Sequence, residues 1–192
     1  RRNRPEAANA GLDAATGDWI TFLDDDDVFL PDHLAGLLAA AAAAPAARVI
    51  TSYAKGVFGD GHVEWFGQPF SLSQLYERNF VHLSAAIFAR ELVAAGCRFD
   101  ESLEILEDWE FMLQLAQRAA FHFVPLGSFQ WNADAGDSGA GCGANRDEKA
   151  FVEHRERIYA KWAEAHRNLC ARTDVLLAAA AEHLNHGRYA QA

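Results

Sequence analysis

The stretch TFLDDDDVFLPDHL, residues 21–34, sets four consecutive aspartates between two apolar runs. The run WITFL, residues 19–23, is continuously apolar and rich in β-forming residues, which predicts a strand covered on both faces. The alanine-rich segment 31–44 begins with a proline, which predicts a helix that ends before Pro45. A strand, an acidic turn and a helix therefore follow one another. We expect the aspartates at the carboxyl end of the strand, where α/β sheets bind their ligands.

The same alternation continues along the rest of the chain. The turn signal Gly59-Asp60-Gly61 separates two strand-like runs, RVITSYAKGVF (48–58) and HVEWFG (62–67), and predicts a hairpin. Further helices are expected over 5–15, over 71–79, from Asp108 onward, and as a pair over 147–185 divided near Thr173. Further strands are expected at 84–89, 121–125 and 128–131, with a glycine-rich loop at 133–145.

Strands that alternate with helices predict an α/β fold, here a mixed sheet flanked by helices. The chain has 192 residues, of which 51% are hydrophobic, and this is enough for one domain with its own core. We assign residues 1–145 to that domain. Residues 146–192 are expected to form a C-terminal helical extension that packs on it.

Composition excludes several classes of partner and compartment. The formal net charge is −10, whereas a nucleic-acid partner would need a basic surface, so we expect no nucleic acid. The three cysteines show no C-x-x-C spacing, which indicates neither a disulfide framework nor a zinc site and favours the cytoplasm. No apolar run has the roughly 20 residues of a transmembrane segment. Peripheral contact with a membrane surface stays open.

Four adjacent carboxylates are costly without a counter-ion. Two like charges about 4 Å apart repel by roughly 4 kcal/mol at an effective dielectric constant of 20, and no basic residue lies nearby in the sequence. On an extended chain Asp24 and Asp26 share a side while Asp25 points the other way, so the first two could bind one ion. Such oxygen ligands suit Mg²⁺ or Mn²⁺ that also holds a substrate phosphate. The alternative is a solvated turn that caps the next helix at Asp32.

A second acidic pair, Glu107 and Asp108, begins a predicted helix. The free N–H groups and the dipole of a helix start favour an ionised carboxylate, which is expected to keep a base deprotonated at neutral pH. A simple first-turn acid is the alternative. The combination with the distant Asp24 and Asp26 favours a functional site.

These two acidic motifs carry a resemblance to a known family. The strings NAGLDAATGDWITFLDDDDVFLPDHL (9–34) and FDESLEILEDWEF (99–111) resemble the family 2 glycosyltransferases of GT-A fold, over roughly residues 3–125. The resemblance implies a nucleotide-sugar donor and a divalent metal, Mn²⁺ or Mg²⁺. It implies Asp26 and Asp24 as metal ligands. The donor-binding residues that it implies are Asn9, Asp24, Asp25 and Asp26.

The second motif implies the acceptor side of the reaction. Asp108 resembles the general base of the family, Glu107 a residue that assists acceptor binding, and Trp109 an aromatic beside the acceptor. Core packing is an equal alternative for Trp109. The expected function is metal-dependent, inverting transfer of a sugar to the hydroxyl of a glycan, a polysaccharide or a lipid-linked acceptor.

The chain also departs from the family pattern. It begins after the βαβ segment with which members bind the nucleoside, so the GT-A domain looks N-terminally incomplete. Ala8 stands where members often have arginine. A non-catalytic remnant or a nucleotide-sugar-binding module is therefore the alternative function. A metal-dependent phosphohydrolase is disfavoured because no constellation of a nucleophile and a lysine accompanies the aspartates.

Three weaker features complete the candidates. The loop 133–145 either covers the donor or is a plain connector, with Asn132 and Asp134 as its polar candidates. Trp65 either lines an acceptor pocket, since aromatic faces stack on sugars, or lies in the core. His82 and His122 fall in apolar runs and are expected to be core or edge residues.

Overall fold

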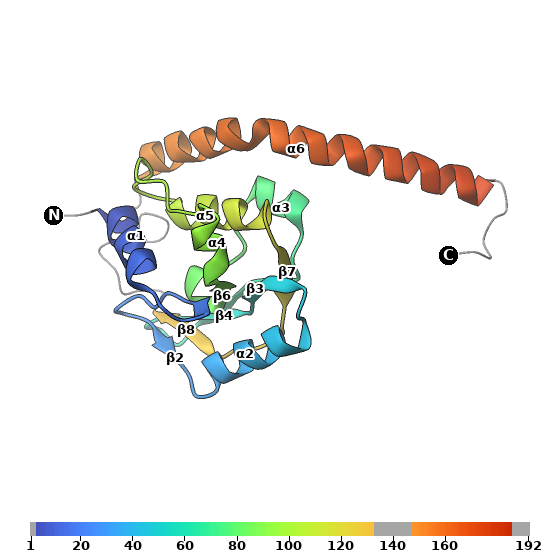
Figure 1. Cartoon of the computed structure of the whole chain (residues 1–192). Coiled ribbons are helices and arrows are strands. Elements are labelled where there is room, and N and C mark those ends of the chain that lie inside the picture. The colour runs from blue at the N-terminus through green and yellow to red at the C-terminus, as the bar shows by residue number, and fades with distance from the viewer. Residues whose placement is uncertain (1–2, 133–146, 186–192) are drawn as a thin grey trace.

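The computed structural model describes residues 3–132 and 147–185 and contains two mixed sheets (Figure 1). The first sheet has the strand order β1 (Trp19–Ile20), β6 (Ala86–Ala89), β3 (Ala47–Thr51) and β7 (Ala120–Phe123). The second has the order β2 (Val28–Phe29), β8 (Phe129–Asn132), β4 (Ala54–Val57) and β5 (Val63–Phe66). The helices are α1 (Arg4–Ala14), α2 (His33–Ala43), α3 (Leu72–Glu77), η1 (Leu83–Ala85), α4 (Arg90–Ala94), α5 (Glu107–Ala116) and α6 (Glu148–Asn185).

The strand pairings confirm a mixed α/β fold. Strand β3 runs parallel to β7 and antiparallel to β6, and β4 runs parallel to β8 and antiparallel to β5. The pairing of β4 with β5 confirms the predicted hairpin. The single strand expected over 48–58 is wrong, because the chain leaves the first sheet at Ser52 and enters the second at Ala54. The strand expected at 19–23 ends at Ile20, and β2 and α4 were not predicted.

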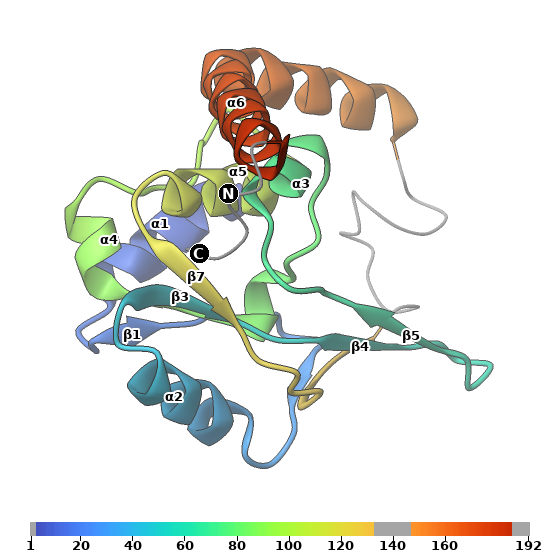
Figure 2. The ribbon, with the colours of Figure 1, turned by 90° about the vertical axis from the view of Figure 1, so that its right-hand side faces the viewer.

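Helices cover both faces of the first sheet (Figure 2). Because side chains alternate along a strand, Val49 faces the core that contains α1, α4 and α5, while Ile50 faces α2. Phe88 and Phe111 are fully buried on the first of these faces, with ring centroids 5.3 Å apart. Burial of such a ring stabilises the fold by roughly 2–3 kcal/mol. This packing fixes α5 above the sheet.

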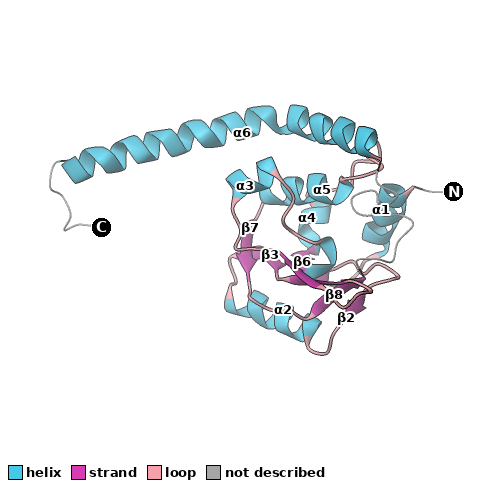
Figure 3. Ribbon diagram, turned by 180° about the vertical axis from the view of Figure 1, so that it is seen from behind, coloured by secondary structure: helices cyan, strands magenta, loops and turns pink. Residues whose placement is uncertain are grey.

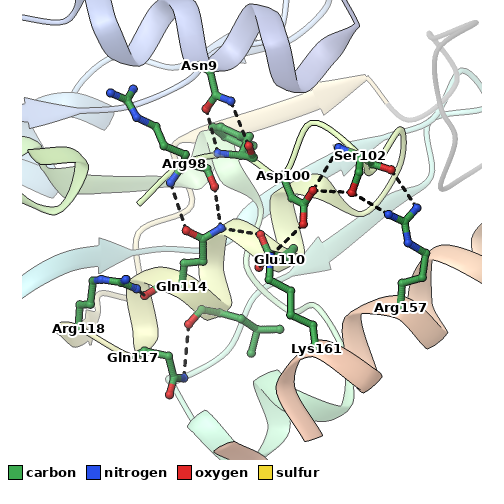
Figure 4. A network of polar contacts seen from close by, with 12 residues as sticks. Asn9, Arg98, Asp100, Ser102, Glu110, Gln114, Gln117, Arg118, Arg157 and Lys161 are labelled. Carbon is green, nitrogen blue, oxygen red and sulfur yellow. Dashed lines mark hydrogen bonds and ion pairs between the residues drawn. The ribbon is translucent and has the colours of Figure 1, made fainter. Parts of the chain in front are cut away.

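A polar network holds the loop before α5 (Figure 4). The Asn9 side chain accepts from the Phe99 amide at 2.9 Å and donates to the Phe99 carbonyl at 3.0 Å. From α6, the Lys161 Nζ lies 2.9 Å from Asp100 Oδ2 and 2.8 Å from Glu110 Oε1. Glu110 is fully buried in the first turn of α5. Helices α1, α5 and α6 are therefore joined through charges and amides as well as through apolar contacts.

Helix α6 is continuous, so the expected division near Thr173 is wrong (Figure 3). The Thr173 hydroxyl donates to the Leu169 carbonyl at 3.0 Å, which satisfies the hydroxyl inside the helix. Ile158 of α6 is buried in the main core. The boundary expected at residue 145 and the loop 133–145 lie outside the described residues. In the described parts of the chain, no helix has both the length and the apolarity that crossing a membrane requires.

We predict that Lys161→Met destabilises the protein by roughly 3 kcal/mol, because it leaves the buried Glu110 carboxylate without its cation. The measurement is the free energy of unfolding in urea. Lys149→Met, on an exposed position of the same helix, is the matched control. Adding Glu110→Gln to Lys161→Met should recover most of the loss, and an unchanged stability of the single variant would contradict the prediction.

Candidate active site

The four aspartates form a tight turn and not an extended segment. The Asp27 amide donates to the Asp24 carbonyl at 3.2 Å, so Asp25 and Asp26 occupy the corner positions of the turn. The expectation that Asp24 and Asp26 share one side of an extended chain is therefore wrong. Asp24, Asp25 and Asp26 are exposed, which keeps their carboxylates accessible to a ligand.

Asp27 anchors the turn to the second sheet. Its Oδ1 accepts from the Asn132 amide at 3.1 Å, at the end of β8. Burial raises the pKa of Asp27 to about 6, the Asn132 hydrogen bond opposes this shift, and the neighbouring aspartates add to it. The turn is thus fixed at its last residue, while the side chains of Asp25 and Asp26 stay exposed.

Arg4 supplies the cation that the sequence near the aspartates lacks. Its guanidinium lies 3.5 Å from Asp24 Oδ2 and 3.5 Å from Glu107 Oε1. Arg4 is in the first turn of α1, whose start is fixed by an Asn3–Glu6 capping box. Sequence reasoning missed Arg4, and the only available signal was the arginine-rich start of the chain. One side chain therefore joins the two acidic motifs.

Helix α5 begins in an unusual backbone conformation. Leu106 has φ 62° and provides no side-chain cap, a conformation that costs on the order of 1 kcal/mol for a residue with a Cβ. The backbone N–H groups of Asp108 and Trp109 favour the charged form of the Asp108 carboxylate and so lower its pKa. Asn79 donates to Asp108 Oδ2 at 2.9 Å, and its own Oδ1 accepts from the Val81 amide at 3.0 Å. Nothing in the sequence signalled Asn79.

Both carboxyls at this helix start have a raised pKa. Burial and the neighbouring Asp108 raise the pKa of Glu107 to about 7, against the opposing effect of Arg4. Burial also raises the pKa of Asp108, although the helix N–H groups, Arg4 and Asn79 oppose it. The helix start was expected to favour ionised carboxylates, but desolvation outweighs its N–H groups and dipole, so the pKa of both groups is raised and not lowered. A carboxylate with a raised pKa is a better proton acceptor near neutral pH.

Two predicted site residues have structural roles in this arrangement. Both ends of the Asn9 amide bond the loop at Phe99, so its predicted donor contact has no structural support. Trp109 is 2% exposed, and its indole N–H donates to the Leu75 carbonyl at 2.7 Å. Trp109 is therefore a core residue, as the alternative interpretation of the sequence expected.

Of the three weaker ring-bearing candidates, His82 is partly buried, whereas His122 and Trp65 are exposed. His82 contacts the rings of Phe129 and Trp131, and burial, with a smaller effect of Arg4, lowers its pKa to about 4. His122 is exposed on β7, as an edge residue. Trp65, in contrast, is 57% exposed, so it does not lie in the core.

Asp26 lines a hollow of about 260 Å³ beside the second sheet, with Val28, Val57, Phe58, Gln130 and Asn132. Within residues 3–132 and 147–185, no group of three histidine, cysteine or acidic side chains is placed to hold a metal. Mg²⁺, however, is often held by only one or two protein carboxylates and completed by substrate phosphates. The exposed Asp24 and Asp26 fit a metal that binds together with a phosphate-bearing substrate, not a preformed metal centre.

Known structures share this fold. A structure of S. aureus TarS, residues 1–349, has a TM-score of 0.57 and 17% identity, over 82% of this chain and 44% of that one. A TarS structure in complex with UDP has a TM-score of 0.55 and 18% identity, over 85% of this chain and 51% of that one. The expected GT-A type of mixed α/β fold is confirmed by these likenesses.

Sequence comparisons agree with the fold. An uncharacterized glycosyltransferase of Haemophilus influenzae is 25% identical over 60% of this chain, and the protein y4gI of Sinorhizobium fredii is 28% identical over 81%. The chain spans only 42% and 18% of the length of these two relatives, respectively. The model of glycosyl transferase family 2 matches residues 1–99, more than half of the chain. The chain therefore belongs to glycosyl transferase family 2.

Proposed function

We propose that this chain carries the catalytic residues of a metal-dependent, inverting glycosyltransferase that moves a sugar from a nucleotide-sugar donor to an acceptor hydroxyl. The observation that carries the proposal is the pair of contacts made by Arg4, which brings Asp24 of the first motif and Glu107 of the second to one guanidinium. A donor held at the aspartate turn would then lie beside a proton acceptor on α5. The fold alone would not support this step, because one fold hosts many functions.

Asp108 is the proposed general base. Its carboxylate takes the proton of the acceptor hydroxyl, the oxygen forms a bond to the anomeric carbon, and the bond to the nucleotide diphosphate breaks from the opposite side. Asn79 holds the Asp108 carboxylate in position at 2.9 Å. Glu107 orients the acceptor. Asp24 and Asp26 are the residues that would hold the metal, which when bound would supply positive charge to the leaving diphosphate.

The UDP complex of a structurally similar protein guides the choice of donor. TarS has been crystallised with UDP, so a UDP-sugar is the donor that we propose to test first. The acceptor is a glycan or a lipid-linked saccharide. The cytoplasm, favoured by the cysteine pattern, stays the predicted compartment. The alternative, a module that binds a nucleotide sugar without turning it over, differs in the outcome of the first experiment below.

Asp108→Asn should lower the rate of UDP-sugar turnover about 10²- to 10⁴-fold, the usual contribution of a general base. The measurement is release of UDP from a panel of UDP-hexoses in the presence of Mn²⁺. Glu104→Gln, an exposed acid in the loop before α5, is the matched control. A wild-type chain that binds but never turns over any donor would support the binding module, and full activity of Asp108→Asn would exclude Asp108 as the base.

Asp26→Ala should weaken Mn²⁺-dependent binding of UDP by at least about tenfold, because Asp26 is one of the two carboxylates that would hold the metal. Titration calorimetry with UDP, with and without Mn²⁺, measures this. Asp18→Ala removes an exposed aspartate before β1 and should change nothing. Equal UDP affinity of the wild-type chain with and without Mn²⁺ would contradict the metal dependence.

Glu107→Gln should raise the stability of the protein above that of wild type, and this gain should be larger at pH 8 than at pH 5. The same variant should lower turnover. A folded pKa of about 7, above the ordinary 4.5, means that the folded state binds more protons, so Glu107 costs stability as the pH rises between these values. Each kcal/mol recovered raises the midpoint of thermal unfolding by about 3 °C. Thermal scans at both pH values test this, and a variant that is less stable at pH 8 than at pH 5, compared with wild type, would contradict it.

A further inference from the structure

One face of the second sheet is open and ends at the aspartate turn. The strand register places Val28, Gln130, Lys55 and Trp65 opposite one another on β2, β8, β4 and β5. Residues directly opposite in neighbouring strands lie on the same face. These four side chains therefore form one row across the whole sheet, which we call the outer row.

The apolar side chains on this face are unusually exposed for valine and tryptophan. Val28 is 50% exposed and Trp65 57% exposed, and Val63, which lies opposite Val57 on the same face, is 37% exposed. Gln130 is half-buried, and no described residue hydrogen-bonds its side-chain amide. An aromatic ring, aliphatic groups, an amide and a lysine are thus presented together. This mixture suits a ligand with both apolar faces and many hydroxyl groups.

Trp65 is held as a platform at one end of the row. A Cβ at Gly127 would come within 2.7 Å of the Trp65 ring, so the ring lies directly on the Gly127 backbone. Tyr53 meets the same ring edge-on, with centroids 6.1 Å apart. With this support behind it, the ring keeps its orientation while more than half of its surface stays exposed. Sugar rings stack on such fixed aromatic faces.

The other end of the row meets the proposed donor site. Val28 and Gln130 line the hollow of about 260 Å³ that also contains Asp26. Three strand spacings of about 4.8 Å separate β5 from β2, which gives the row a length of about 14 Å. That span exceeds one sugar ring, so the outer row fits an extended saccharide whose end reaches the aspartate turn.

We propose that the outer row binds the acceptor as an oligosaccharide, with Trp65 as its distal stacking platform and Gln130 as a hydrogen-bonding group near Asp26. The choice of a saccharide over a second protein copy rests on the continuity of the row with the hollow at Asp26. The role of this saccharide as an acceptor rests on the proposed transferase function. The saccharide-binding surface itself can be tested without any transfer activity.

The test uses the whole chain and a panel of probes: the hexasaccharides of β-1,4-glucose, α-1,4-glucose and β-1,4-N-acetylglucosamine, with the matching monosaccharides. Binding is followed by calorimetry and by tryptophan fluorescence. At least one hexasaccharide should bind more tightly than its monosaccharide. Trp65→Ala should weaken that binding about fivefold to tenfold, and Trp65→Phe should restore most of it.

A second variant removes the platform without removing the ring. Gly127→Ala should displace the Trp65 ring and weaken hexasaccharide binding in the same way as Trp65→Ala. Thermal unfolding of both variants checks that the fold persists. Equal affinity of wild type and both variants, or binding of none of the hexasaccharides, would overturn the proposal.

Two further measurements separate the possible failures. Light scattering reports the oligomeric state, and a dimer that Trp65→Ala dissociates, without saccharide binding, would make this face an interface between copies and overturn the proposal. UDP binding of the wild-type chain is measured in parallel. If UDP fails to bind while a hexasaccharide binds through Trp65, the proposed transferase function fails and the saccharide surface stands.

Discussion

The guanidinium of Arg4 holds together two acidic groups that the sequence places far apart. Asp24 and Glu107 approach the same cation, and without it the burial of Glu107 beside Asp108 would leave adjacent carboxyls with no opposite charge. The contacts are 3.5 Å long and the Arg4 side chain is 52% exposed, so solvent weakens them. Such a cation neutralises the site and can still be displaced by a ligand that brings its own positive charge.

The position of α5 determines where the two carboxyls of the second motif lie. Apolar packing of Phe111 against Phe88 sets its height above the sheet, and the buried Glu110 with Lys161 ties it to α6. A buried ion pair adds little net stability compared with apolar residues of the same size, but the loss of one partner is costly. The main effect of the Glu110–Lys161 pair is therefore to fix which face of α5 packs against the sheet.

Local patterns predicted the elements, and long-range contacts decided the site. The hairpin of β4 and β5 and the start of α5 followed from turn residues and helical spacing, and these depend on neighbours in sequence. The partnership of Arg4 with Glu107 and of Asn79 with Asp108 did not, because no sequence pattern links residues that only the fold brings together. The break at Ser52 was missed because both halves of the run have strand composition, and only pairing partners distinguish them.

The aspartate turn and the strand that closes it are separated by most of the domain, since Asp27 accepts a hydrogen bond from an amide 105 residues later in the chain. Contacts of this kind form late, because loop closure must be completed before they contribute. During synthesis the turn therefore emerges long before β8 exists to fasten it. Until β8 has been synthesised, the four consecutive charges keep this segment hydrated. They thereby reduce its tendency to aggregate before the sheet is complete.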